Sequence, residues 1–152
     1  MSAEARIREL GIDLPGPPAP AGLYAPAVQT GSLLFVSGQL PLAGGELRAR
    51  GKLGAAYTAE QGAGFARQCA LNGLAVVRGH LGSLDRVVKV VKVTGFVASA
   101  PNFTQQPLVI NGASQLLIDV FGEAGRHARA AVGMAELPMG APVEVEFIFE
   151  VS

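Results

Sequence analysis

The sequence predicts an α+β domain in which a mixed β-sheet carries two main helices on one face. The first observation is the order of patterns along the chain: two or three strand-like runs, a helix, a strand, a helix and two more strands. The second is that both long helical patterns repeat their apolar residues at helical spacing, over residues 58–81 and 106–121. A length of 152 residues fits one domain with its own core.

The N-terminal region is expected to form a short helix and a proline-rich linker. Residues 2–10 are amphipathic, and Gly11 stands where a helix would end. Residues 14–21 hold four prolines in eight positions, which predicts an extended segment. We therefore divide the chain into residues 1–21, the helix and linker, and residues 22–152, the domain. A docking role for the linker is the weaker interpretation, because the next strand follows at once.

Two strands, residues 24–28 and 33–38, are predicted to form a hairpin around Gly31. The second strand is strongly apolar until it reaches Ser37 and Gly38, where small and polar groups indicate that a buried strand comes to the surface. A glycine at this position lets a backbone or a ligand approach closely.

A third strand is expected over residues 46–49, followed by the first long helix. Thr58 and Gln61 have the spacing of a capping box at the start of this helix. Each glycine in a helix costs roughly 1 kcal/mol relative to alanine. The glycines of this helix are therefore expected where it lies close on a sheet: Gly62, Gly64 and Gly73.

The strongest strand pattern covers residues 87–98, which are rich in β-branched side chains, and residues 106–121 form the second long helix. Three residues of the first long helix receive structural interpretations. Cys69 is expected to be a small core residue, Asn72 a core polar group with its hydrogen bonds satisfied, and His80 an exposed histidine near the helix end.

The stretch from residue 126 to 146 combines a cation, two strand-like runs and a carboxylate. Residues 131–135 and 143–147 alternate as strands do, and the turn between them contains two prolines and Gly140. Arg129 and Glu144 are then expected close together at strand ends. Arg129 offers a charged planar fork that suits a carboxylate, and Glu144 can move protons in a dry site. On pattern alone, a structural or surface ion pair is the favoured interpretation.

Composition excludes several classes of function. Twelve basic and 12 acidic residues give no net charge, so nucleic acid is not the expected partner. One cysteine, no secretory leader and no apolar run of about 18 residues predict a cytoplasmic protein outside the membrane. No metal or cofactor is expected, since the chain has only two histidines and no phosphate-binding glycine loop. A charged fraction of 16% favours a homo-oligomer with small-molecule sites between subunits.

Five short motifs carry a family resemblance through their order and spacing. They are Tyr24-Ala-Pro-Ala-Val, Gly31-Ser-Leu-Leu-Phe-Val-Ser37-Gly38-Gln39-Leu-Pro41, His127-Ala-Arg129, Glu136-Leu-Pro138 and Val143-Glu144-Val145-Glu146. Together they resemble the YjgF/YER057c/UK114 family, also called the Rid or reactive intermediate deaminase family. The VINGAS and GRHARAAVG stretches look like a subgroup of that family whose members are mostly uncharacterised.

The resemblance implies a chorismate mutase-like α+β fold assembled as a homotrimer. It also implies clefts between subunits that hydrolyse enamine or imine acids such as 2-aminoacrylate to a 2-keto acid and ammonia. In such clefts Arg129 would bind the substrate carboxylate and Glu144 would hold or activate the water. The substrate-binding residues would be Tyr24, Ser37, Gly38 and Asn111, together with Arg129.

One departure from the family pattern concerns substrate range, because Ala131 stands where many relatives carry a cysteine or another small polar residue. Two other functions stay open. The same cleft would serve a non-catalytic protein that binds a small carboxylate. Endoribonuclease action is the less favoured alternative, because the chain is neutral and lacks a basic, aromatic-rich surface.

Overall fold

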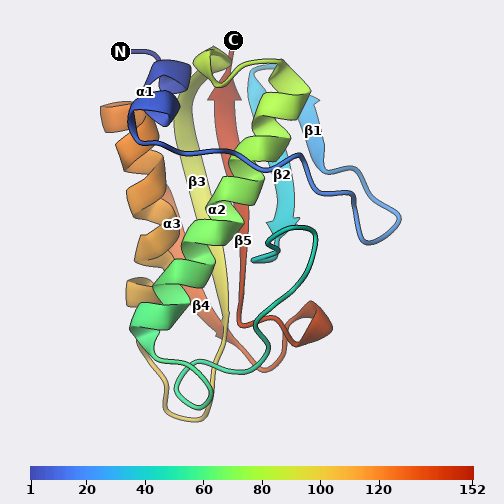
Figure 1. Ribbon diagram of the computed structural model, residues 1–152, viewed down its shortest axis with the longest axis vertical. Coiled ribbons are helices and arrows are strands. Elements are labelled where there is room, and N and C mark those ends of the chain that lie inside the picture. Colours follow the sequence, from blue (N-terminus) through green and yellow to red (C-terminus); the bar gives the residue numbers. More distant parts are fainter.

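The computed structural model describes residues 1–152 and contains a five-stranded mixed β-sheet with two long helices lying across one face (Figure 1). The main elements are α1 (Ala3–Glu9), β1 (Ala27–Thr30), β2 (Leu33–Gln39), α2 (Ala59–Leu81), β3 (Val87–Ala98), α3 (Gln106–Phe121), β4 (Ala128–Met134) and β5 (Val143–Val151). Three 3-10 turns join them: η1 (Leu84–Arg86), η2 (Gly122–Gly125) and η3 (Pro138–Gly140). The predicted fold class is confirmed.

The strand order in the sheet is β1-β2-β5-β3-β4, with β4 parallel to β3 and every other pair antiparallel. The expectation that the last two strands lie side by side is therefore wrong, because β3 separates them. Helix α3 returns the chain along the sheet, so β3, α3 and β4 form a crossover unit that pairs β4 with β3. The loop after β4 then crosses the end of β3, where Ala98 N–H donates to Pro142 O at 2.9 Å.

Two strand boundaries differ from the sequence-based prediction. Strand β1 begins at Ala27 rather than at Tyr24, because the chain bends at Tyr24 and again at Pro26. Residues 46–49 form no strand, and only an isolated bridge joins Ala43 to Glu46. Leu47 instead packs into a small second core with residues from the loops around β5.

Helix α2 begins with the predicted capping box. Thr58 N–H donates to Gln61 Oε1 at 2.9 Å, and Gln61 N–H donates to Thr58 Oγ1 at 3.2 Å. Cys69 is fully buried and Asn72 nearly so, and the Asn72 side-chain amide donates to the carbonyls of Leu40 and Leu42 at 2.9 and 3.0 Å. Both residues therefore have the structural roles predicted for them. Asn72 also fixes the segment that follows β2.

The glycines of α2 have different surroundings. Gly73 packs against the ring of Phe147, so α2 lies close on β5 there, as expected. A Cβ at Gly62 would instead meet Val109 of α3 and Leu53 of a loop. Gly64 is exposed and has no neighbour within 4 Å of a Cβ position, so the expectation of a close contact is wrong for this residue.

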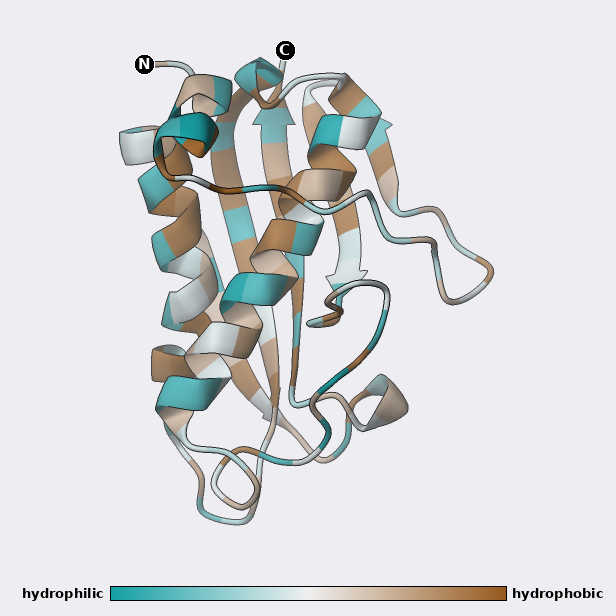
Figure 2. Cartoon of the chain, viewed as in Figure 1, coloured by the Kyte–Doolittle hydropathy of each residue, from teal (hydrophilic) through white to brown (hydrophobic).

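Most of the core lies between the helices and the sheet. Figure 2 shows bands of apolar and polar residues along the strands, which is the alternation of a sheet with one covered face. The other face carries no helix, and it exposes Val28 and Phe35 by 56% and 42% of their surface and Val132 by 42%. An apolar face of this kind is commonly buried by another copy of the chain.

Helix α1 packs on the same layer as the long helices. Ile7 is 2% exposed and belongs to the main core, and Glu4 forms an ion pair with Arg78 of α2 at 2.6 Å. Across the whole chain, no helix combines the length and apolar character needed to cross a bilayer.

Candidate active site

Four of the predicted site residues line one groove at the end of β2: Tyr24, Ser37, Gly38 and Glu144. The groove has a volume of about 710 Å³ and is open to solvent. Its other lining residues are Ala21, Leu40, Pro138, Met139 and Glu146. We call this hollow the Glu144 groove. It combines two carboxylates with an apolar rim.

A β-bulge positions Ser37 and Gly38 in the groove. Val36 pairs with Phe147 and Gln39 with Val145, so β2 has one more residue than β5 between these two pairs. The Ser37 hydroxyl donates to Ala25 O at 2.7 Å, which ties the bulge to the segment carrying Tyr24.

Gly38 leaves the space that the Glu144 carboxylate occupies. A Cβ at position 38 would overlap Glu144 Oε1 and would lie 2.9 Å from Glu144 Cδ. A group does approach Gly38 closely, but it is the Glu144 side chain and not the backbone or ligand that the sequence-based analysis expected.

Glu144 has no hydrogen-bond or ion-pair partner in the chain and is partly buried opposite Phe96 of β3. Burial raises its pKa above the usual range, and the neighbouring charge of Glu146 raises the pKa further. A carboxylate with a raised pKa accepts and returns a proton more readily near neutral pH. The electrostatics of the groove thus suit general acid–base chemistry.

Tyr24 belongs to the loop before β1 and lines the Glu144 groove. The chain leading into β1 projects from the body of the molecule to the right in Figure 1. The Tyr24 hydroxyl accepts a hydrogen bond from Ala21 N–H at 3.3 Å, and half of its side chain is exposed. The aromatic ring therefore stands at the mouth of the Glu144 groove.

The other two predicted residues, Arg129 and Asn111, meet on the helix side of the sheet. Arg129 Nη1 donates to Asn111 Oδ1 at 2.8 Å and to Ser114 Oγ at 3.2 Å, and Nη2 donates to Pro107 O at 3.4 Å. All three acceptors belong to α3. We call Arg129, Asn111, Ser114 and His127 the Arg129 cluster.

The guanidinium of Arg129 keeps two N–H groups free. An arginine has five N–H donors, of which the contacts to α3 use three. Nε has no acceptor within the chain, and Nη2, which has two hydrogens, has one acceptor. Nε and Nη2 share one edge of the guanidinium plane. Two parallel N–H groups of this kind form the fork that binds a carboxylate with both oxygens.

Ser114 and His127 were given no role by the sequence-based analysis. Ser114 Oγ lies 2.9 Å from His127 Nε2, and His127 Nδ1 lies 2.6 Å from Gly125 O. Two signals could have found them. Ser114 stands one helical turn after Asn111, and His127 stands two residues before Arg129, which puts it on the same side of an extended chain.

Arg129 and Glu144 do not meet within one chain. Arg129 lies opposite Val93, whose side chain faces the helices, whereas Glu144 alternates with the buried Val143 and Val145 and faces the open side. Strand β3 also separates them, so their strands are about 10 Å apart. The expectation of neighbouring strand ends is wrong for a single chain, and so is the alternative of an ion pair between these two residues.

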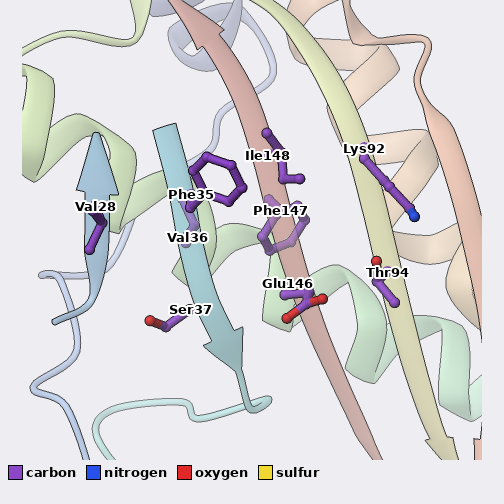
Figure 3. Close-up of a pocket in the computed structure, with 9 residues that line it drawn as sticks. All are labelled: Val28, Phe35, Val36, Ser37, Lys92, Thr94, Glu146, Phe147 and Ile148. Atoms are coloured by element: carbon purple, nitrogen blue, oxygen red, sulfur yellow. The ribbon is translucent and has the colours of Figure 1, made fainter. Parts of the chain in front are cut away.

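A second hollow continues from the Glu144 groove across the open face of the sheet, and the two share Ser37 and Glu146 (Figure 3). Figure 3 shows side chains from four neighbouring strands around it, with Phe35 beside Ile148 and with Lys92 and Thr94 on β3. The groove therefore opens towards the apolar face that lacks a cover. No three His, Cys, Asp or Glu side chains come together as metal ligands anywhere in the chain.

The fold is an α+β arrangement with helices on one face of a mixed sheet, and the Arg129 cluster and the Glu144 groove lie on opposite sides of that sheet. The family model described as "YjgF/chorismate_mutase-like, putative endoribonuclease" matches residues 4–150. The chain belongs to this YjgF family.

Three similar proteins support this membership. Protein TCP17 of Trypanosoma cruzi is 50% identical over 151 residues, covering 97% of this chain and 93% of that protein. A 2-iminobutanoate/2-iminopropanoate deaminase of Dermatophagoides farinae is 33% identical, covering 90% of this chain and 92% of that protein. The crystal structure of Atu1372 from Agrobacterium tumefaciens, a protein of unknown function, is 47% identical with a TM-score of 0.91, covering 99% of this chain and 92% of the other.

Proposed function

We propose that this protein hydrolyses reactive 2-imino and enamine acids, such as 2-aminoacrylate, to 2-keto acids and ammonia. The reaction takes place in clefts between the copies of a cytoplasmic homotrimer, in which one copy supplies the Arg129 cluster and its neighbour the Glu144 groove. Cys69, the single cysteine, is buried and unpaired, which is consistent with a reducing compartment. Residues 1–21 are proposed to form an N-terminal helix and linker that pack against the domain of residues 22–152.

The observation that carries the proposal is that the Arg129 cluster and the Glu144 groove are chemically complementary and yet face opposite sides of the sheet in one chain. Arg129 is held by α3 with a free edge for a carboxylate, and Glu144 is an unpaired acid with a raised pKa. A 2-imino acid needs both groups at once, because its carboxylate adjoins the electrophilic carbon. A second copy of the chain would bring them together.

The proposed reaction requires no cofactor. An enamine acid first takes a proton from solvent on its terminal carbon and becomes the iminium form of the imine. Arg129 binds the carboxylate, and Glu144 accepts a proton from water as the water oxygen bonds to the imine carbon. Glu144 then returns that proton to the nitrogen of the tetrahedral intermediate. The carbon–nitrogen bond breaks as the hydroxyl proton of the intermediate passes to Glu144, and the 2-keto acid and ammonia leave.

The deaminase from Dermatophagoides farinae supports this choice of reaction, since it shares 33% identity over most of both chains. The family description also mentions an endoribonuclease. A chain without net charge has little attraction for a polyanion, and the Glu144 groove holds two acidic side chains. Salt-sensitive RNA binding would favour that alternative.

The test mixes two inactive variants. We expect the purified protein to accelerate ammonia release from enzymatically generated 2-aminoacrylate and to elute as a trimer. Arg129→Ala and Glu144→Gln should each lose this activity and remain trimers. Unfolding and refolding the two variants together at equal concentrations should restore about one quarter of wild-type activity, because one random pairing in four joins two intact halves.

Each outcome separates the alternatives. If the refolded mixture of Arg129→Ala and Glu144→Gln recovers no activity, Arg129 and Glu144 of one active site do not come from different copies. If wild type accelerates no imino acid while Glu144→Gln binds pyruvate as tightly as wild type does, the protein is a carboxylate-binding module instead.

A further inference from the structure

The contacts behind Arg129 define a one-way chain of hydrogen bonds. A carbonyl only accepts, so His127 Nδ1 carries the hydrogen and donates to Gly125 O at 2.6 Å. A guanidinium only donates, so Ser114 Oγ accepts from Arg129 at 3.2 Å. When His127 is neutral, its Nε2 can only accept, so the Ser114 hydroxyl donates to it at 2.9 Å. Arg129, Ser114, His127 and Gly125 form one relay.

This relay requires a neutral His127. Burial lowers the His127 pKa, the Gly125 carbonyl partly opposes that shift, and the charge of Arg129 lowers the pKa further. The other charged groups nearby are Arg126 and Glu123, which pair with each other at 3.1 Å in the segment before β4.

Helix α3 presents no charge to the His127 ring. Its one ionisable residue, Asp119, accepts a hydrogen bond from Gln115 at 2.8 Å. The positive charge of Arg129 is therefore the main nearby charge that a bound anion would change.

We propose that Ser114 and His127 are positioning residues that hold Arg129 for carboxylate binding, and that a carboxylate bound at Arg129 draws a proton onto His127. The inference rests on the proposed function only in placing a carboxylate at Arg129, and it requires no turnover.

The reason is electrostatic. A carboxylate offsets the arginine charge that opposes protonation of the ring. Once protonated, Nε2 donates to Ser114, whose oxygen has a second lone pair for Arg129. The coupling is reciprocal, so carboxylate affinity rises as pH falls through the His127 pKa.

The test of proton coupling follows the two histidine rings by NMR titration, with pyruvate as the probe. His80, exposed and bonded only to Gln29, is the internal control, and His80→Gln assigns the signals. Saturating pyruvate should raise the His127 pKa and leave that of His80 unchanged. Binding of pyruvate without any change at His127 would overturn the coupling. Pyruvate binding no tighter to wild type than to Arg129→Ala would overturn both this inference and the proposed site.

The test of positioning uses two pairs of variants. Ser114→Ala and His127→Leu should each weaken pyruvate binding and raise KM about tenfold with a smaller change in kcat. Ser114→Thr keeps the hydroxyl and His127→Gln offers an amide oxygen as acceptor, so both should recover most of the loss. Wild-type binding in all four variants would exclude a positioning role. If pyruvate still raises the His127 pKa but no imine is hydrolysed, the proposed function is wrong and the present inference is supported.

Discussion

The Arg129 cluster and the Glu144 groove differ in how far their charges are satisfied. Arg129 is fixed by three acceptors on α3, and its remaining donors are on Nε and Nη2. Glu144 and Glu146 have no hydrogen-bond partner in the chain. Burial raises the pKa of Glu144, and the charge of Glu146 raises it further. Arg129 is thus held in position before any ligand binds. The carboxylates of the Glu144 groove can form hydrogen bonds only with water, a substrate or another copy of the chain.

The largest loss of activity is expected when the planar guanidinium of Arg129 is replaced by an ammonium group. Arg129→Lys keeps the charge but loses the planar fork and most of the contacts to α3, so kcat/KM for 2-aminoacrylate should fall by roughly a hundredfold. Arg67→Lys, at an exposed position of α2, is the matched control and should behave as wild type. Steady-state ammonia release measures both. Activity within a factor of three of wild type in Arg129→Lys would mean that charge alone suffices and that the prearranged fork has no part.

The next largest effect is expected on stability, when the space at Gly38 that the Glu144 carboxylate occupies is filled. Gly38→Ala places a Cβ against the Glu144 carboxylate, and we expect a loss of about 1–3 kcal/mol in the free energy of unfolding. Gly64→Ala is the contrast, since that Cβ meets nothing within 4 Å in an exposed turn of α2. It should gain about 0.5–1 kcal/mol from helix propensity. Chemical denaturation measures both, and equal effects would contradict the tight approach at Gly38.

The sequence was sufficient for the elements that depend on local patterns. The capping box at Thr58 and the apolar periodicities placed α2 and α3, and the β-branched run placed β3. Strand neighbours were harder to predict, because alternation in β4 and β5 shows which side chains share a face but not which strand lies between them. The parallel pairing of β4 with β3 depends on α3 returning the chain, which is a property of the whole fold.

The site residues show the same limit. The family resemblance named Arg129, Asn111 and Glu144, and the structure brings the first two to 2.8 Å of each other. Ser114 and His127 could not be assigned from residue type, because a serine in a helix and a histidine before a strand usually have other roles. Their function depends on β4 packing against α3, where three groups of different chemistry meet.

The smallest expected effect is the pH dependence of stability that Glu144 contributes. Its folded pKa is raised, so the folded state binds this proton more tightly than the unfolded state, whose carboxyl has a pKa of about 4.3. The stabilisation is therefore present below that unfolded value and is lost as pH rises through the folded pKa. Glu144→Gln should match wild type near pH 4 and become more stable than wild type towards pH 7, by less than the Gly38→Ala effect. Denaturation across this range measures the difference. Glu146→Gln removes the second cause of the shift, so in that background the effect of Glu144→Gln should be smaller and should reach its full size at a lower pH. If the free energies of unfolding of Glu144→Gln and wild type differ by the same amount at every pH, Glu144 is as well solvated in the folded protein as in the unfolded chain. The electrostatic contrast between the Arg129 cluster and the Glu144 groove would then be wrong.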